Sequence, residues 1–199
     1  MTKLDDLILA SVSPRRAEIL ASLGIRVEII PSAYDERSIP DLSPTQLALA
    51  HASGKARNVA ERCPGRVVVS ADTVVDVDGQ IFGKPRDDAE AAVMLRTLSG
   101  RSHLVHSAVC LIAGEASRHL EFCATTRVWF YPLTEREIAG YIATGEPRDK
   151  AGAYGIQGRG ATLVERIDGD FYTVMGFPLA QFVRSLPAVD LCYRCEPGA

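Results

Sequence analysis

Long apolar runs are missing from this sequence: none reaches the ~18 residues that a membrane-spanning helix requires. Cysteine is scarce too, with five residues scattered along 199 positions, an odd number that argues for reduced thiols rather than a disulfide framework. Neither charge dominates, because 22 lysines and arginines face 25 aspartates and glutamates, for a net charge of −3. We therefore expect no general affinity for nucleic acid or for an anionic membrane. The first residues lack the apolar core of a signal peptide, so we expect a cytoplasmic protein.

The composition is that of a globular protein, since 47% of the residues are hydrophobic and 24% are charged. We expect strands over residues 7–10, 26–32, 102–114 and 118–133, and a strand followed by a hairpin over 65–85. We expect helices over residues 14–24, 43–63, 87–100, 134–146 and 176–186. This order predicts an α/β fold in one domain, residues 1–199, with a mixed, elongated sheet flanked by helices in two lobes. Residues 187–199 have the character of a frayed tail.

The stretch LILASVSPRRAEILASLG, residues 7–24, has the pattern of a buried strand, a tight turn and a helix. Ser13 suits the N-cap of this helix and Pro14 its first turn. A helix start already presents free N–H groups and a partial positive charge, so it attracts anions. Adding Arg15 and Arg16 at this point suits a polyphosphate lying between them. The alternative is a pair of solvated surface charges.

Two further charged residues stand where apolar segments end. Asp72 follows the run VVVSA, and a carboxylate at the end of a buried strand is unfavourable unless it meets a metal, a cation or a proton. Because ligands of α/β proteins bind at strand ends, Asp72 is a candidate metal ligand or general base. The alternative is a structural aspartate bonded to backbone N–H groups. Lys84 is held extended by Pro85, which makes it a positioned cation or, alternatively, an ordinary hairpin residue.

Residues 152–160, GAYGIQGRG, are rich in glycine, which lets the backbone approach a ligand closely. Within this stretch Tyr154 is suited to stacking on a base, and Gln157 to reading a base edge or binding a phosphate. The spacing matches neither a dinucleotide fingerprint nor a Walker loop. The alternative interpretation is a flexible hairpin loop.

The remaining metal-ligating side chains form no pattern that indicates a metal. Cys192 and Cys195 form a C-x-x-C without a second pair of ligands, which argues against a zinc or redox role, and the function of this tail stays open. His103 and His106 lie three residues apart in a predicted strand and so face opposite sides. All four histidines lack the spacing of a zinc motif and are interpreted as structural: His51, His103, His106 and His119.

Five motifs, taken together and in this order, resemble the Maf family of nucleoside triphosphate pyrophosphatases: SVSPRR, SADTVV, GKPRD, DKAGAYGIQG and VMGFPL. The resemblance covers residues 7–186. It implies an α/β fold with a cleft between two lobes, similar to inosine triphosphate pyrophosphatases. It also implies cytoplasmic hydrolysis of a nucleoside triphosphate to the monophosphate and pyrophosphate, with a divalent metal, Mg²⁺ or Mn²⁺. A homodimer is compatible with it, and neither nucleic acid nor a membrane is an expected partner.

The resemblance also implies roles for individual residues. Its catalytic positions fall on Asp72, Glu36 and Lys84. Its substrate-binding positions fall on Ser11, Arg15, Arg16, Lys55, Thr73 and Gln157. Glu36 and Asp72 would hold the metal, and Asp72 would accept a proton from the attacking water.

The pattern SPRR, ADT and YGIQG resembles the branch of the family that acts on dTTP and UTP. In that branch Arg15, Thr73 and Gln157 occupy positions linked to substrate choice. One alternative is a family member that acts on 7-methyl-GTP or another non-standard nucleotide. The other is a nucleotide-binding regulator of cell division that has no turnover. Val12 and Ser70 stand where glycine or another small residue is common in the family.

Overall fold

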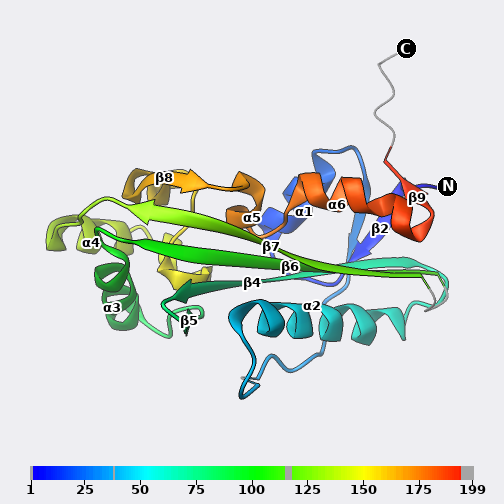
Figure 1. Cartoon of the computed structure of the whole chain (residues 1–199), viewed down its shortest axis with the longest axis horizontal. Coiled ribbons are helices and arrows are strands. Elements are labelled where there is room, and N and C mark those ends of the chain that lie inside the picture. The colour runs from blue at the N-terminus through cyan, green and yellow to red at the C-terminus, as the bar shows by residue number, and fades with distance from the viewer. Residues whose placement is uncertain (1, 38, 115–117, 194–199) are drawn as a thin grey trace, which may run out of the picture.

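The computed structural model describes residues 2–37, 39–114 and 118–193, and a seven-stranded mixed sheet runs along its length (Figure 1). The strand order is β3-β2-β4-β6-β7-β8, with β5 paired to β4. The bounds of these strands are β2 (Asp6–Leu9), β3 (Arg26–Ile29), β4 (Val67–Val77), β5 (Gln80–Phe82), β6 (Ser102–Ala113), β7 (Arg118–Phe130) and β8 (Val164–Asp168). The predicted mixed α/β fold is confirmed.

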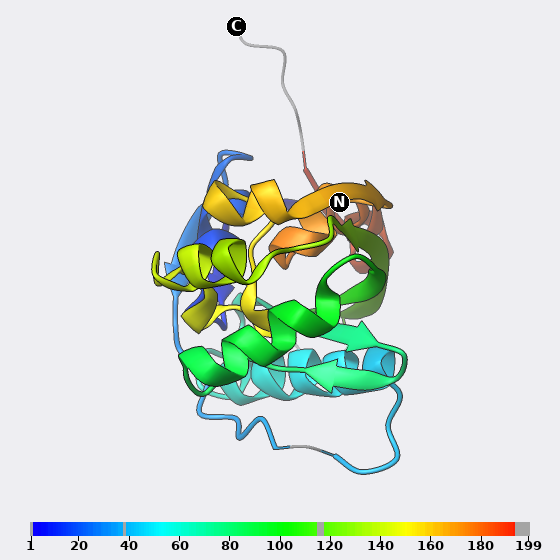
Figure 2. The same ribbon diagram turned by 90° about the vertical axis from the view of Figure 1, so that its left-hand side faces the viewer.

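Helices cover both faces of this sheet (Figures 1 and 2). The α-helices are α1 (Pro14–Ala21), α2 (Pro44–Ala60), α3 (Asp88–Leu98), α4 (Glu135–Ile142), α5 (Phe171–Met175) and α6 (Leu179–Ser185). Short 3-10 turns are η1 (Glu146–Asp149), η2 (Ala151–Ala153), η3 (Gly158–Leu163) and η4 (Leu186–Val189). In Figure 1, α2 lies along one face, α1 and α6 lie near one end of the other face, and α3 and α4 lie at the opposite end. The short α5 was not expected from the sequence.

Local sequence signals account for most of these boundaries. Ser43 and Thr134 each form the predicted cap at the start of α2 and α4, and both caps are closed reciprocally as capping boxes. Asp78 and Gly79 both have positive φ, 53° and 87°, as a two-residue hairpin turn between β4 and β5 requires. Ser13 occupies the predicted N-cap of α1 but makes no side-chain cap there. Its N–H instead donates to Ser11 Oγ at 3.2 Å.

Two hydrophobic cores lie at opposite ends of the long strands, and the halves of the molecule built around them are called the first and second lobes here. The first packs α1 and α6 on the sheet and contains Phe177 and Phe182, both fully buried. The second packs α3 and α4 and contains Leu95 and Phe130. Between the two cores the sheet carries polar side chains, and this is where the cleft described below opens.

The middle of β4 is where the sheet has an open edge. β2 runs parallel to β4 only as far as the pair Leu9↔Val69, and β5 begins to pair at Val75↔Phe82. Between these points, over residues 70–74, β4 is paired with β6 alone, and we call these residues the open stretch of β4. Asp72 therefore lies in the interior of an 11-residue strand, and the prediction that it ends a strand is wrong. The strand that ends beside it is β2.

The prediction of a frayed tail is wrong for residues 187–193. β9 (Leu191–Cys192) pairs in parallel with β1 (Thr2–Lys3), and Leu191 and Val189 are buried in the first core. Residues 194–199, and with them Cys195, lie outside the described residues. Within the part of the chain that is described, no helix has the length and apolarity to cross a membrane.

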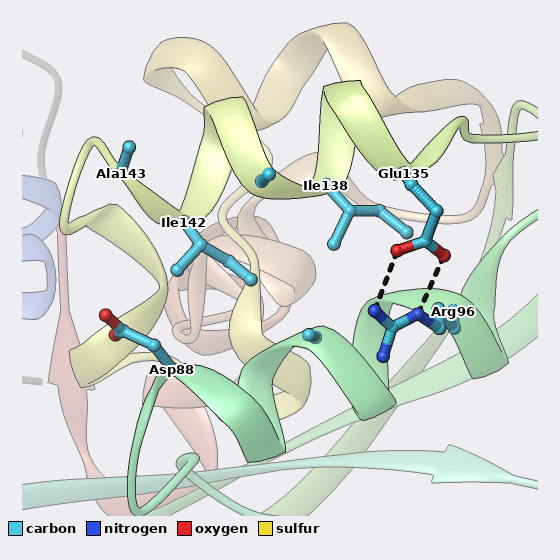
Figure 3. A pocket seen from close by; sticks show the side chains of 8 residues that line it. Asp88, Arg96, Glu135, Ile138, Ile142 and Ala143 are labelled. Atoms are coloured by element: carbon cyan, nitrogen blue, oxygen red, sulfur yellow. Dashed lines mark hydrogen bonds and ion pairs between the residues drawn. The ribbon is translucent and has the colours of Figure 1, made fainter.

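A small cavity of about 310 Å³ lies on the outside of the second lobe, between α3 and α4 (Figure 3). Ile138 and Ile142 form its apolar wall. Arg96 closes one end by donating to both carboxylate oxygens of Glu135, at 2.8 and 2.7 Å. None of the predicted site residues lines this cavity.

His103 gives the second lobe a pH-dependent stability. Its Nε2 is 2.7 Å from the hydroxyl of Tyr154, and burial, assisted by Arg101, lowers the pKa of His103 from 6.5 to about 4. The unfolded chain takes up a proton here below about pH 6.5, whereas the folded protein does so only near pH 4. Stability therefore falls as the pH drops through this window, by about 3 kcal/mol from this group. Urea unfolding at neutral pH and near pH 4 measures the loss.

The matched variant is His103→Gln, which keeps a hydrogen-bonding group near Tyr154 but does not titrate. We expect a flatter dependence of the unfolding free energy on pH. Part of the slope remains, because burial also lowers the pKa of His106. An unchanged slope in the variant would contradict the assignment to His103.

Candidate active site

A cleft of about 950 Å³ between the two lobes is lined by every residue that was predicted to belong to the site. These are Ser11, Arg15, Arg16, Glu36, Lys55, Asp72, Thr73, Lys84 and Gln157. They come from the turn before α1 and its first residues, the loop before α2, α2 itself, the open stretch of β4, the segment after β5 and the glycine-rich segment. Segments that are far apart in sequence thus meet around one space.

A buried lysine stands at the centre of this cleft. Lys55 Nζ lies 2.6 Å from Asp72 Oδ1 and 3.3 Å from Glu36 Oε1. Lys55 and Asp72 are almost fully buried, at 6% and 7% exposed, whereas Glu36 is half exposed. Helix α2 packs directly on β4, which places the lysine against the open stretch of that strand. Each buried charge is thereby matched by an opposite charge, as burial demands.

Glu36 and Asp72 offer a donor set that fits a divalent cation. Both carboxylates converge on the position of one ammonium group, so they face the same space. Carboxylate oxygens are the ligands that Mg²⁺ and Mn²⁺ prefer, and Mg²⁺ is commonly held by one or two carboxylates together with substrate phosphates. The residues present therefore fit the metal that the family resemblance implies.

The guanidinium of Arg16 is fixed by three hydrogen bonds. Nε donates to the carbonyl of Gly176 at 2.9 Å, Nη1 to Ser11 Oγ at 3.1 Å and Nη2 to Thr73 Oγ1 at 3.1 Å. Burial lowers the pKa of Arg16, and the nearby carboxylates of Asp72 and Glu36 oppose that effect. Both terminal nitrogens keep a second N–H that can serve an anion. A rigid, charged fork of this kind suits a phosphate group.

Thr73 has its hydroxyl bound to protein side chains. Besides Arg16, its Oγ1 is 2.8 Å from Ser107 Oγ, which in turn donates to the carbonyl of Thr173 at 2.7 Å. The hydroxyl of Thr73 therefore holds the arginine in place. The contribution of Ser107 and Thr173 was not predicted, because it depends on β6 and α5 lying beside β4.

Arg15 reaches across the cleft to the glycine-rich side. Its Nη1 lies 3.3 Å from Asp149 Oδ2, and Lys150 Nζ contacts the other oxygen of the same carboxylate at 2.6 Å. The two adjacent arginines thus have different surroundings, since Arg16 is fixed in the first lobe while Arg15 bridges to η1. Asp149 begins the motif DKAGAYGIQG, but sequence reasoning assigned it no role.

The glycine-rich segment is held by close contacts. Glu146 accepts hydrogen bonds from the N–H groups of Arg159 and Gly160, at 3.1 and 3.3 Å. A Cβ at Gly160 would lie 2.2 Å from the carbonyl oxygen of Gly155, so only glycine fits there. Gln157 is exposed between these contacts, at the N-cap of η3, and lines the cleft. Lys84 is likewise exposed and lines the cleft.

Tyr154 borders the cleft but belongs to the core of the second lobe, and its burial argues against the prediction that it stacks on a base. It is 5% exposed, and its ring packs edge-on against Phe130 and His103, with ring centroids 4.7 and 5.3 Å away. His51, interpreted as structural, lines the cleft instead, with Nδ1 3.4 Å from the hydroxyl of Tyr34. The spacing of His51 and Lys55, one turn apart on α2, is the sequence signal that could have indicated this.

Comparison with known proteins identifies the family. The model of the family described as Maf-like protein matches residues 6–189. The chain belongs to this family. This Maf-like protein is 49% identical over 178 residues to the dTTP/UTP pyrophosphatase of Carboxydothermus hydrogenoformans, an alignment that covers 89% of the chain and 95% of the relative. It is 52% identical over 185 residues to the dTTP/UTP pyrophosphatase of Bacillus velezensis, covering 93% and 97%.

Among solved structures, the Ham1 protein of Staphylococcus aureus matches this Maf-like protein with a TM-score of 0.43 and 13% identity. The match covers 63% of this chain and 71% of the other. A likeness of this size carries no argument about the site.

Proposed function

We propose that this Maf-like protein hydrolyses dTTP and UTP to the nucleoside monophosphate and pyrophosphate, with Mg²⁺ or Mn²⁺ as cofactor. The observation that carries the proposal is a cleft in which fixed cations surround a buried carboxylate, Asp72. Relatives that are 49% and 52% identical and bear the name dTTP/UTP pyrophosphatase support the choice of substrates.

The cations of the cleft suit a triphosphate. Arg16 is held by three hydrogen bonds, Arg15 is half-buried, Lys84 is exposed, and Lys55 lies buried beside the carboxylates. Arginine binds phosphate oxygens through paired N–H groups, and lysine acts as a point charge. The overall chain is acidic, so this concentration of positive charge is a local feature, as a site for a polyanion requires.

The proposed chemistry is attack of water on the α-phosphorus. A divalent metal held by Glu36 and Asp72 would supply charge neutralisation and a more acidic water. Asp72 Oδ1 accepts a hydrogen bond from Lys55, and the remaining lone pairs of the carboxylate would bind the metal and accept the proton of the attacking water. The bond from the α-phosphorus to the bridging oxygen then breaks and pyrophosphate leaves. Arg15 and Arg16 stabilise the charge that develops on the phosphoryl oxygens.

Pyrophosphate release from dTTP, UTP, CTP, GTP, 7-methyl-GTP and ITP tests the proposal, each with Mg²⁺, with Mn²⁺ and with chelator. We expect metal-dependent release from dTTP and UTP. Hydrolysis in ¹⁸O-labelled water should place the label in the monophosphate. Release from 7-methyl-GTP or ITP alone would refute the pyrimidine substrates. Binding of nucleotide without any release would refute the enzyme and favour the nucleotide-binding regulator.

Gln157 offers a test of base recognition. The edge of uracil or thymine carries one donor between acceptors, which an amide can match and a carboxylate cannot. We expect Gln157→Glu to lower kcat/KM for dTTP and UTP by ~10-fold or more, the scale of one mismatched hydrogen bond. The kcat/KM for CTP, whose base edge carries an amino group that a carboxylate can bind, should rise relative to the values for dTTP and UTP. The measurement is kcat/KM for the same nucleotides.

The matched control is Gln181→Glu, which makes the same chemical change on an exposed position of α6 outside the cleft. It should leave the ranking of nucleotides as it is in the wild type. If Gln157→Glu also leaves the ranking unchanged, Gln157 does not read the base.

A further inference from the structure

Outside the cleft, three side chains with metal-binding chemistry meet on the β6–β7 hairpin. Cys110 lies directly opposite Glu121 in the antiparallel register, and His119 precedes Glu121 by two residues. Residues two apart in a strand share a face, so all three side chains lie on one side of the sheet. That side is the one covered by α2, whose Ser53 donates a hydrogen bond to Glu121 Oε2 at 2.5 Å.

The distances among the ligand atoms match a tetrahedral metal site. His119 Nε2 is 3.4 Å from Cys110 Sγ and 3.4 Å from Glu121 Oε2. The three atoms all lie within 4.8 Å of one another. Zinc bonds of about 2.3 Å to sulfur and about 2.1 Å to nitrogen and oxygen, at tetrahedral angles, separate neighbouring ligand atoms by about 3.4–3.6 Å. Two of the three separations therefore have this length already.

The surroundings of the three ligand atoms also suit a bound metal. Cys110 is fully buried, whereas the side chains of His119 and Glu121 are 32% and 43% exposed. The group is thus open to solvent on one side, which provides an entry path and space for water as a fourth ligand. The bond from Ser53 orients the carboxylate in the way that outer-shell partners orient metal ligands.

We propose that Cys110, His119 and Glu121 bind Zn²⁺. The bound ion would cross-link β6 to β7 beneath α2 and so stabilise the hairpin that these two strands form. A sulfur, nitrogen and oxygen donor set favours zinc over Mg²⁺, so this site and the carboxylates of the cleft take different ions. Binding replaces the thiol proton of Cys110, which passes to solvent, by a sulfur–zinc bond. The sequence interpretation of His119 as structural missed this group, because its ligands come from two strands and form no linear motif.

Cobalt substitution tests the site, because Co²⁺ takes zinc positions and gives a thiolate-to-cobalt charge-transfer absorption only when sulfur is a ligand. The full chain carries the substitutions Cys192→Ser and Cys195→Ser, which remove the two cysteines of the C-x-x-C. This background protein is stripped with chelator and titrated with Co²⁺. We expect the band to appear and to saturate near one equivalent. Cobalt bound to the carboxylates of the cleft does not produce it.

His119→Ala in this background should abolish saturation of the band near one equivalent. Cys123→Ala is the matched control, since this cysteine lies on the same strand and face as Glu121 but not in the group, and it should leave the band intact. His119 is partly exposed, so the variant should fold, and circular dichroism without metal checks this. A missing band in the background protein, or a band that His119→Ala leaves unchanged, would overturn the proposal.

Melting gives a second readout that does not depend on cobalt. Zn²⁺ should raise the Tm of the background protein by more than that of His119→Ala, because an ion that binds only the folded state stabilises it and the variant lacks this site. Mg²⁺ should shift the Tm of the two proteins equally, because the carboxylates of the cleft are present in both. Equal shifts with Zn²⁺ in both proteins would also overturn the proposal.

Discussion

An Asp72→Asn variant is expected to keep its fold and to lose about 100-fold or more of its kcat for dTTP, the scale of a positioned acid–base group. The reason is that an amide cannot accept the proton of the attacking water and is a weak ligand for a divalent metal. The carboxylate is buried beside Lys55 at 2.6 Å, so no exposed group can take over its position. Steady-state kinetics with Mg²⁺ measures the effect.

Two comparisons make the Asp72 result specific. Asp168→Asn, on an exposed position of β8 outside the cleft, should turn over dTTP at the wild-type rate. Circular dichroism should confirm that Asp72→Asn is folded, since Lys55 keeps its contact with Glu36 at 3.3 Å. If the folded variant hydrolyses dTTP at close to the wild-type rate, Asp72 is not the proton acceptor.

Replacing Lys55 by methionine should have the largest effect on stability. Methionine preserves the volume of the side chain but leaves Asp72 buried without its cation, and breaking a buried ion pair in this way lowers the free energy of unfolding by about 3–5 kcal/mol. Glu36 contributes less, because it is half exposed and water can solvate it. Urea unfolding followed by circular dichroism at neutral pH gives the value.

The double variant Lys55→Met, Asp72→Asn separates the ion pair from simple packing. Because the neutral amide needs no cation, we expect the double variant to recover part of the stability that Lys55→Met loses, while turnover stays lost. The interaction free energy from the four proteins measures the pairing of the two charges. Purely additive losses would mean that Lys55 stabilises the fold through its packing alone.

Local signals in the sequence were sufficient for most elements. Ser43 and Thr134 began their helices as predicted, and Asp78 with Gly79 formed the expected turn. These features depend on neighbouring residues only. β9 could not be predicted, because a two-residue strand is stabilised by its non-local partner β1. The same holds for α5, which has only five residues and therefore no longer apolar pattern, and whose N-cap Asp170 stands two residues after the end of β8.

The site was predictable as a set of charges but not as a geometry. Arg15, Arg16 and Asp72 were found from the way cations and a carboxylate interrupt apolar segments. Glu36 entered through the family resemblance alone. The burial of Tyr154 could not be predicted, because it depends on contacts with residues far away in the sequence. A tyrosine among glycines has the local pattern of an exposed side chain, yet Tyr154 packs against His103 of β6 and Phe130 of β7.

The open edge of β4 has a consequence for how motion is distributed around the cleft. Asp72 lies on a strand that is hydrogen-bonded to β6 along most of its length, and such central strands exchange their amide hydrogens slowly, through near-global unfolding. Lys84 and Gln157 are exposed and lie outside the regular strands, and exposed segments of this kind open locally at lower free energy than central strands do. Under the proposed function, the nucleotide's base and outer phosphates would meet exposed chain segments, whereas the carboxylate is carried by a strand that does not open locally.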